Sequence, residues 1–420
     1  MNVRTRTVHR ALAGALAAAA MAAAALTAPA AAEAAGTTAA DGRETAAGHD
    51  RHAATRSAME AQVAAGIPGV LGQARDDHGT WRGSAGIADR TTQRPRLAQD
   101  RFRIASVSKV FTSVVLLQLE AEGRIGLDDP VERWLPRVVR GNGHDGREIT
   151  VRQLLNHTSG IYNYTEDPAF QKLLGPDFLE HRFDDHTPDE LVKTAMAHAP
   201  YFRPGGGWHY SNTNYVLAGM VVEKVTGRSY ATEIKRRIIR PLGLTATTLP
   251  GTAPELPGPH GRAYSTLQAE PAPGAKIYDV TELNPSWGGA AGEIISTTGD
   301  LNRFYGALIG GKLLPKAQQR ELLTAVPVGD QAPGARYGLG VLTAPLSCGV
   351  TVWMHTGGVH GSGTIASATA DGRHTAAFNF NGDWTGDLGA LVEAEYCGKA
   401  PSGGSALAGP QKTMTLMALR

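Results

Sequence analysis

The sequence predicts an α/β (α+β) protein in which an antiparallel β-sheet flanked by helices is interrupted by an inserted, mainly helical lobe. Near the start, short strands at 70–75 and 80–88 enclose Asp-Asp-His-Gly, a typical hairpin turn. From about 125 to 285 the chain is rich in Pro, Gly, His and helical stretches, without strand alternation. Strands separated by Gly, Pro or Asp-Gly then return, at 337–343, 351–355, 364–368 and 375–381. Both chain ends are therefore expected to build one sheet.

The predicted helices lie before, within and after the lobe. The longest covers 107–122 and ends at Gly123, because glycine commonly follows the C-terminus of a helix. Its apolar residues lie on every side, which is typical of a helix buried in the core. Shorter helices are expected at 53–65, 151–155, 214–226, 300–309 and 390–396.

The charge balance argues against a dense basic surface. The chain contains 41 Lys and Arg residues and 39 Asp and Glu residues, and three of the arginines lie in the first 32 residues, which hold no acid. The rest of the chain is close to neutral, so a nucleic-acid binder is not expected. Hydrophobic residues at 42% and charged residues at 19% are typical of a folded globular protein.

Residues 1–32 have the features of a secretory signal peptide. Three arginines precede an uncharged, Ala-rich run over 11–32, which contains Ala-x-Ala cleavage sites at 28–30 and 30–32. The run is long enough to span a membrane, so an anchor is the alternative, although the run is only weakly apolar. We expect cleavage and secretion to the extracellular space, with no membrane span left afterwards.

The rest of the chain is expected to form three segments. A lead over 33–52, made of Ala, Gly, Thr and scattered charge, is predicted to be disordered. A globular domain is expected over 53–400, with the helical lobe at about 125–285. Residues 401–420 begin Gly/Ser-rich and are predicted to be a flexible tail.

Cys348 and Cys397 are the two cysteines of the chain. In an exported protein they are expected to form a disulfide, which would close a loop of about 50 residues and contribute about 4 kcal/mol. Two buried free thiols are the alternative. No C-x-x-C pair or His/Cys cluster has the spacing of a zinc site, so no metal is expected.

A first chemical motif, Ser106-Val107-Ser108-Lys109, lies where an extended segment turns into the buried helix. Positions three apart share a helix face, so the Lys109 amine is expected beside the Ser106 hydroxyl. A buried lysine loses proton affinity through desolvation and can then accept or relay the hydroxyl proton. A helix N-cap followed by a surface lysine is the alternative.

A second motif, Tyr210-Ser211-Asn212, follows the glycine-rich loop 204–207. In an extended segment residues i and i+2 point the same way, so Tyr210 and Asn212 are expected to face one cavity. A tyrosine near a cationic lysine is expected to have a lowered pKa and to act as a base. The alternative is a turn tyrosine with a capping asparagine.

A third motif, His355-Thr356-Gly357, is followed by Gly358 and is predicted to end the strand 351–355. Its glycines permit the close approach of an extended substrate, which could pair as an added strand. An ordinary turn at a strand end is the alternative.

The three motifs, in this order, resemble the signature of the serine β-lactamase and penicillin-binding D-alanyl-D-alanine peptidase superfamily: S-x-x-K, then Y-x-N, then [KH]-[ST]-G. Tyrosine in the second motif resembles class C enzymes and carboxypeptidases, and histidine in the third resembles secreted D-Ala-D-Ala carboxypeptidases, as do the two cysteines that bracket it. The resemblance extends over roughly 55–398. Its flanks include the segments 126–131, 149–160 and 210–219, and Trp287 before Ala291-Gly292.

The resemblance implies a β-lactamase/DD-peptidase-like fold and a serine hydrolase that forms an acyl-enzyme on Ser106. Lys109 and Tyr210 would form the proton-transfer pair. The backbone N–H groups of Ser106 and Gly358 would form the oxyanion hole. The implied substrate-binding residues are Asn212 for the amide, Trp287 for the cleft wall, His355 and Thr356 for the carboxylate side, and Gly358.

By this resemblance the protein is expected to be a secreted, monomeric serine D-Ala-D-Ala carboxypeptidase that needs no cofactor. Its substrate would be a peptidoglycan stem peptide or another small acyl compound, and β-lactams would be covalent ligands. Alternatives with the same chemistry are a class C-like β-lactamase, an esterase and a D-aminopeptidase. A peptidoglycan- or β-lactam-binding protein without turnover belongs to a different class.

One departure from the resemblance concerns the substrate carboxylate, which a guanidinium would bind best. Leu342 and Ala344 lie where carboxypeptidase-type relatives can carry an arginine. The expected substitutes are Arg336, the Thr356 hydroxyl or His360.

Overall fold

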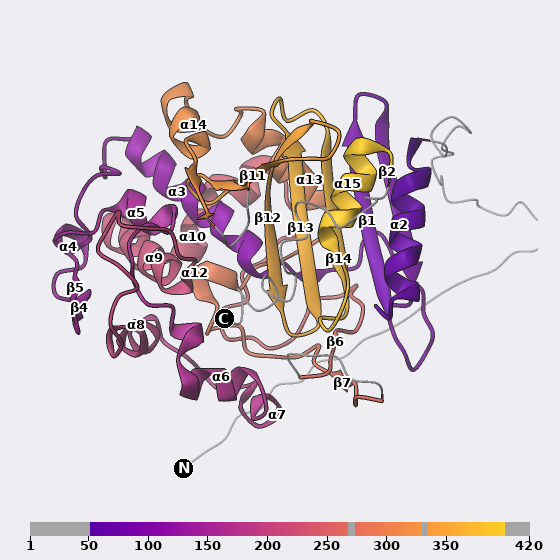
Figure 1. Ribbon diagram of the computed structural model, residues 1–420, viewed down its shortest axis with the longest axis horizontal. Coiled ribbons are helices and arrows are strands. Elements are labelled where there is room, and N and C mark those ends of the chain that lie inside the picture. The colour runs from indigo at the N-terminus through magenta and orange to yellow at the C-terminus, as the bar shows by residue number, and fades with distance from the viewer. Residues whose placement is uncertain (1–50, 268–273, 330–333, 400–420) are drawn as a thin grey trace, which may run out of the picture. The chain divides into compact units, whose positions relative to one another are not determined.

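An eight-stranded antiparallel sheet lies at the centre of the computed structural model, which describes residues 51–267, 274–329 and 334–399 (Figure 1). Its strands, in spatial order, are β2 Gly79–Gly86, β1 Gly69–Asp76, β14 Thr375–Phe380, β13 Ser362–Thr369, β12 Thr351–Val359, β11 Leu342–Pro345, β10 Arg336–Tyr337 and β9 Val326–Pro327. β1 pairs with β14, which brings Val70 opposite Phe380. Both ends of the domain therefore build one sheet, and the predicted fold class is confirmed.

Helices cover both faces of this sheet. α2 Ala53–Ala64 and α15 Leu388–Cys397 lie side by side on one face, and α13 Thr298–Ile309 lies on the other (Figure 1). The two faces follow from strand alternation. On β13, Ile365 joins the core shared with α2 and α15, whereas Ala366 joins the core shared with α13.

The segment between β2 and β9 supplies the helical lobe and the elements that join it to the sheet. The lobe helices are α4 Val131–Trp134, α5 Val151–Leu155, α6 Pro168–Leu174, α7 Phe178–His181, α8 Pro188–Met196, α9 Asn212–Thr226, α10 Tyr230–Ile234, η3 Lys235–Ile239 and α11 Arg240–Leu242, with the short turn η2 Tyr164–Glu166. The joining elements are β3 Phe102–Arg103, η1 Ala105–Val107, α3 Ser108–Ala121, α12 Gly289–Gly292, β8 Ile295–Ser296 and α14 Lys316–Leu323. Two-residue ribbons pair β4 Arg140–Gly141 with β5 His144–Asp145, and β6 Tyr264–Ser265 with β7 Tyr278–Asp279.

Helix α3 is buried on nearly every side, as its apolar sequence predicts. It packs against α9 and α12 of the lobe. Its Phe111 ring stacks on Phe304 of α13, with the ring centroids 3.8 Å apart. Because α3 joins the lobe to the helix under the sheet, the residues at its start are held between the two halves of the domain.

Two strand predictions need correction. The expected strand 337–343 is divided into β10 and β11 by a tight turn in which the Gly338 N–H donates to Val341 O. Gly340 in this turn has φ +95° and lies so close to Ser113 that a Cβ would come within 2.3 Å of Oγ. Glycine therefore allows both the backbone conformation and the contact with α3.

The strand expected to end at His355 continues to Val359 as β12, so the third motif lies inside a strand. Gly357 pairs with Thr364 and Gly358 with Gly363 of β13. A Cβ on Gly357 would meet Ile104 O at 2.1 Å. The glycines thus mark a close approach of β12 to the backbone beside the first motif, not the end of the strand.

The termini of the domain are joined by polar and covalent contacts. Cys348 and Cys397 form the predicted disulfide. Glu395 of α15 accepts hydrogen bonds from Thr55 of α2, and its carboxylate contacts both His52 and His374. His52, predicted as the last residue of the lead, therefore packs with the domain. The predicted signal peptide, the rest of the lead up to residue 50, and the tail 401–420 lie outside the described residues.

Within the described ranges, no helix combines the length and the apolar character needed to cross a bilayer.

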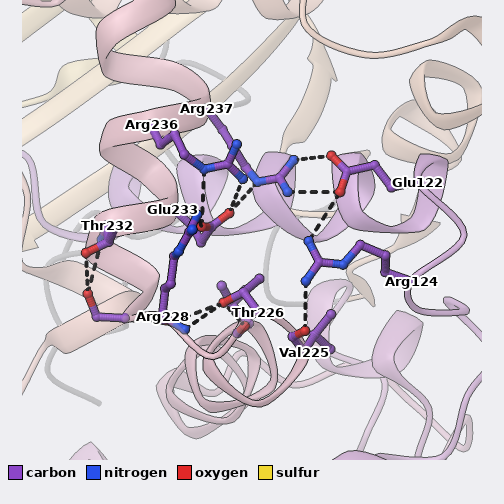
Figure 2. A network of polar contacts seen from close by, with 11 residues as sticks. Glu122, Arg124, Val225, Thr226, Arg228, Thr232, Glu233, Arg236 and Arg237 are labelled. Atoms are coloured by element: carbon purple, nitrogen blue, oxygen red, sulfur yellow. Dashed lines mark hydrogen bonds and ion pairs between the residues drawn. The ribbon is translucent and has the colours of Figure 1, made fainter.

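A network of charged residues joins the ends of α3, α9 and α10 (Figure 2). Arg237 Nε lies 2.6 Å from Glu233 Oε2, and Arg237 Nη2 lies 3.0 Å from Glu122 Oε2 just past α3. Arg124 contacts Glu122 and donates to Val225 O of α9. Burial alone would raise the pKa of Glu233, but hydrogen bonds from Arg236 and Arg237 outweigh it and hold that pKa at about 2.

Replacing the bridging arginine tests the network. Side-chain exposure is 6% for Arg237 and 1% for Glu233. We therefore expect Arg237→Met to lower the free energy of unfolding by about 2 kcal/mol. The loss is smaller than for a buried carboxylate left with no partner, because Arg236 still contacts Glu233. Urea unfolding measures the change. The control Arg133→Met removes a pair in which Arg133 is 62% exposed, and should cost less than about 1 kcal/mol. Equal losses in the two variants would contradict a stabilising role for the network.

Candidate active site

The turn between β3 and α3 positions Ser106. β3 pairs with β8, which fixes the chain up to Arg103. Ala105 then has φ +46°, a left-handed conformation that is strained for any residue with a Cβ. The change of direction places Ser106 in η1, one turn before Lys109.

The Lys109 amine is fully buried and lies within hydrogen-bonding distance of three oxygens. Nζ is 2.9 Å from Ser106 Oγ, 2.7 Å from Asn212 Oδ1 and 2.8 Å from Ala291 O. The first and second motifs are therefore in direct contact, and α12 completes the set. Burial lowers the pKa of Lys109 well below its usual value. The surface-lysine alternative is wrong for this residue.

These contacts determine where the lone pair of a neutral Lys109 points. The carbonyl oxygens of Asn212 and Ala291 are acceptors only, so they take the two N–H groups of the neutral amine. The orientation of the Asn212 amide agrees with this. Its Nδ2 donates to Thr165 Oγ1 at 3.3 Å, which leaves Oδ1 facing Lys109. The remaining direction faces the Ser106 hydroxyl, the one neighbour that can donate a proton. The arrangement therefore suits Lys109 to accept that proton.

Tyr210 lies beside this pair but does not have the predicted acidity. Its hydroxyl is hydrogen-bonded to Ser106, and its ring centroid lies 4.9 Å from Lys109 Nζ. Burial raises the pKa of Tyr210, whereas a lowered pKa was expected. The expected lowering of the Tyr210 pKa required a positively charged Lys109. Because burial favours the neutral form of Lys109, that charge is absent. Tyr210 is thus placed as a proton donor.

His355 of the third motif is buried and neutral. Its Nδ1–H donates to Thr356 O, so Nε2 accepts from the Tyr337 hydroxyl at 2.8 Å. Burial lowers the pKa of His355 to about 3. The imidazole therefore supplies no positive charge to a substrate carboxylate at neutral pH.

A pocket of roughly 380 Å³, partly open to solvent, lies in front of Ser106. Of the predicted residues, Ser106, Asn212, Trp287 and Gly358 line it, while His355 and Thr356 are not among its lining residues. The backbone of Trp287 is fixed by a hydrogen bond in which its carbonyl oxygen accepts from the Tyr164 hydroxyl. Much of the remaining wall is apolar and comes from Leu283, Pro285, Ala291 and Val359.

Arg103 is the cation in this lining, and sequence reasoning missed it. It lies three residues before Ser106, so its place next to the first motif was a usable signal. The two charged substitutes that the sequence suggested lie elsewhere. Arg336 is exposed and donates to Ala325 O, and His360 is buried against Phe178, with ring centroids 3.6 Å apart.

His157 is a second residue whose role was missed, although its segment was noted for the resemblance. It is fully buried and has φ +62°. Nδ1 accepts from the Ser211 N–H at 3.2 Å and from Asn214 Nδ2 at 3.1 Å, and the ring lies 4.4 Å from that of Tyr210. His157 therefore holds the segment that carries Tyr210 and Asn212.

Comparison with known proteins agrees with this geometry. A family model described as Beta-lactamase matches residues 52–392. The crystal structure of a D-stereospecific amidohydrolase from Streptomyces sp. is 58% identical, covers 83% of this chain and 99% of that chain, and has a TM-score of 0.79. The D-amino acid amidase from Ochrobactrum anthropi SV3, solved with D-phenylalanine, is 28% identical, with coverages of 80% and 93% and a TM-score of 0.70.

Among curated proteins, Penicillin-binding protein 4* of Bacillus subtilis (strain 168) is 30% identical over 315 residues, which are 71% of this chain and 64% of that protein. The chain spans less than two thirds of the length of the first curated relatives that it matches.

The contacts of His157 predict that replacing it lowers kcat more than it changes KM. His157→Phe keeps an aromatic ring but removes the acceptor for Ser211 and Asn214, so we expect kcat to fall at least about tenfold, the equivalent of one lost hydrogen bond. KM should change less, because the pocket walls remain. His157→Asn restores an acceptor and tolerates φ above zero, so it should recover part of the loss. Steady-state kinetics on the hydrolysed substrate, with circular dichroism as the folding control, measure both. A rise in KM with kcat unchanged, or no recovery by asparagine, would contradict the positioning role.

Proposed function

Because the chain belongs to the Beta-lactamase family, whose fold and serine-hydrolase motifs it carries, we propose that it is an amidohydrolase acting on amides and peptides of D-amino acids. The observation that carries the proposal is the three-oxygen environment of Lys109, which turns its lone pair toward Ser106. This arrangement supports acyl transfer through a serine ester. The names of the two structural relatives support D-configured substrates.

In the proposed reaction, Lys109 takes the Ser106 hydroxyl proton while Oγ attacks the substrate carbonyl carbon. Tyr210 donates its proton to the leaving nitrogen as the C–N bond breaks, and the proton on Lys109 replaces it. Water then attacks the ester carbonyl and gives one proton back to Ser106 Oγ, and the carboxylic acid leaves. Asn212 is placed to orient the substrate amide. Gly358 lines the same pocket, and its backbone N–H would bind the substrate carbonyl oxygen.

The pocket supports a substrate with an apolar side chain. Leu283, Pro285, Trp287 and Val359 offer apolar surface next to Ser106. No carboxylate belongs to the lining that the described residues form, so a substrate ammonium group finds no ion-pair partner on these walls. An apolar D-amino acid amide, held by its side chain and its amide group, fits these features.

D-Ala-D-Ala carboxypeptidase activity is the second candidate. Its support is the similarity to Penicillin-binding protein 4* and the presence of one cation, Arg103, in the pocket lining. It ranks second because His355 is neutral and Arg336 lies elsewhere, so the expected carboxylate side carries no charge. Secretion and a monomeric state remain proposals, based on the predicted signal peptide and on the resemblance.

Parallel substrates decide between the candidates. We expect D-phenylalanine amide to be hydrolysed at least about tenfold more efficiently than L-phenylalanine amide, since a misplaced side chain in an apolar pocket costs about 1–3 kcal/mol. Release of D-alanine from an acylated D-Ala-D-Ala peptide should be slower. Ser106→Ala should abolish all turnover and the acyl adduct seen by intact mass. Equal rates for the two enantiomers would overturn the proposed stereospecificity, and preferential release of D-alanine would establish the second candidate.

The lowered pKa of Lys109 predicts the pH dependence. A neutral amine is required, so kcat/KM should rise with pH through a limb that lies well below 10.5, the ordinary lysine value. Lys109→Arg keeps a basic side chain but stays protonated at every accessible pH, so activity should fall at least about a thousandfold. Lys224→Arg, on the outer part of α9, is the control and should leave the profile unchanged. A rising limb near 10.5 in the wild type would contradict the lowered pKa of Lys109.

A further inference from the structure

A second pocket, of roughly 310 Å³ and partly open to solvent, lies next to the catalytic pocket, and Arg103 belongs to the lining of both. Four arginines line this second pocket: Arg96, Arg101, Arg103 and Arg262. The lining contains no aspartate or glutamate among the residues that the structure describes. Four positive charges thus gather around one small cavity.

Two of these guanidinium groups are buried without a counter-charge in contact. Arg96 is 3% exposed and Arg103 is 4% exposed. Their hydrogen bonds go to neutral acceptors: Arg96 to Gly69 O, Asn379 O and Asn379 Oδ1, and Arg103 to Pro254 O and Leu283 O. A buried charge is costly unless an opposite charge and hydrogen bonds compensate it.

Several N–H groups of this cluster have no hydrogen-bond partner in the described part of the chain. They are the Nε groups of Arg96, Arg101 and Arg103, and Nη1 of Arg103. Burial lowers the pKa of Arg96 to about 9 and that of Arg103 to about 10, so both remain cationic at neutral pH. The pocket therefore combines positive charge with unused donors.

The nearest carboxylates are engaged elsewhere. Asp100 pairs with Arg94, 3.1 Å away, accepts from the Leu97 N–H, and acts on Arg96 only through space. Glu255 is exposed and acts on Arg103 only through space. Asp279 lies 3.3 Å from Arg262 at the surface, and Asp383 accepts from the Gly361 N–H. None of these carboxylates touches Arg96 or Arg103.

The same lining also offers unused acceptors. His360 Nε2–H donates to Leu174 O, so Nδ1 carries a lone pair, and it has no partner among the described residues. Asn381 Oδ1 is likewise without a donor in the described ranges. The amide nitrogen of Asn381 donates instead to Ile87 O and Arg262 O. A simple carboxylate has no proton for these atoms, whereas hydrogen phosphate carries both anionic oxygens and a hydroxyl.

We propose that this arginine pocket, lined by Arg96, Arg101, Arg103, Arg262, His360 and Asn381, binds a small hydroxyl-bearing oxyanion such as hydrogen phosphate. The anionic oxygens face the guanidinium groups, which suit phosphate through paired N–H donors. The hydroxyl donates to His360 or Asn381. Arg101 and Arg262 are the more exposed pair and form the solvent side of the site.

Occupation of this pocket would join two segments that adjoin the catalytic pocket to a third segment that does not. β3 leads to Ser106, the turn 360–362 follows Gly358 and Val359, and the segment 256–263 lies outside them. A bound oxyanion would therefore stabilise the wall on the Arg103 side of the catalytic pocket. The inference concerns a separate site and does not depend on the proposed amidohydrolase activity.

Phosphate binding to the mature protein tests the proposal by isothermal titration calorimetry and thermal unfolding, with sodium chloride holding the ionic strength constant. We expect saturable binding and a rise in Tm that follows occupancy. Arg101→Gln/Arg262→Gln should weaken phosphate binding at least about tenfold, since each charged hydrogen bond lost is worth a factor of this size. The control Arg373→Gln removes an exposed arginine paired with Asp77 and should bind as the wild type does.

Two results would overturn oxyanion binding in this pocket. One is the absence of saturable phosphate binding in the wild type. The other is an equal rise of Tm in the wild type, the double variant and the control, which would be a general salt effect on the folded state. Acetate binding as tightly as phosphate would overturn the need for a hydroxyl-bearing oxyanion. If the double variant does not fold, Arg262→Gln alone provides the comparison, because its side chain is 47% exposed.

Discussion

The burial of one amine, that of Lys109, is the constraint on which the rest of the active site depends. An amine can stay in the core only if neighbouring oxygens satisfy its hydrogen bonds, and the protein supplies them from three elements. Ser106 comes from the turn before α3, Asn212 from the start of α9 and Ala291 from α12. Each of these elements must therefore be placed to within a few tenths of an ångström. The packing of α3 and the charged network at the far ends of α3, α9 and α10 provide that placement.

The same burial sets the electrostatic character of the site. Lys109, His157 and His355 all have lowered pKa values because they are removed from water. Three basic side chains around the Tyr210 ring therefore contribute proton acceptors and hydrogen bonds in place of positive charge. Arg103 is the exception, because a guanidinium keeps its proton even when buried. Positive charge at the catalytic pocket is thus confined to one wall, which is the wall shared with the arginine pocket.

Local signals predicted much of the fold. Gly123 and Gly227, each following a helical stretch, mark true helix ends, and the helix 151–155 is found with the predicted bounds. The three motifs also lie close together, as their resemblance to a family implied. The helix ends and bounds depend on short-range periodicity and capping, which a single sequence records well, whereas the proximity of the motifs was implied by the resemblance alone.

Other features depend on contacts that local patterns do not reveal. Gly357 and Gly358 have the composition of a turn, yet they continue a strand because the backbone of Ile104 leaves no room for a side chain. The acidity of Tyr210 was predicted wrongly because it depends on the protonation of a lysine over a hundred positions away in the sequence. Arg103 looked like an ordinary strand residue, and its place in two pockets follows from the tertiary arrangement of Pro254, Leu283 and the β12–β13 turn.

The pairing of β1 with β14 has a consequence for biosynthesis. Ser106 is made before the strand that approaches it through Gly357 and before the strand that closes the sheet at Phe380. A nascent or truncated chain that ends before β12 lacks Gly358 and Val359, and so lacks part of the catalytic pocket. Contacts between such distant residues also form slowly during folding. The pocket around the nucleophile is therefore complete only after β12 has been made and has paired into the sheet, which separates the synthesis of Ser106 from the assembly of its site.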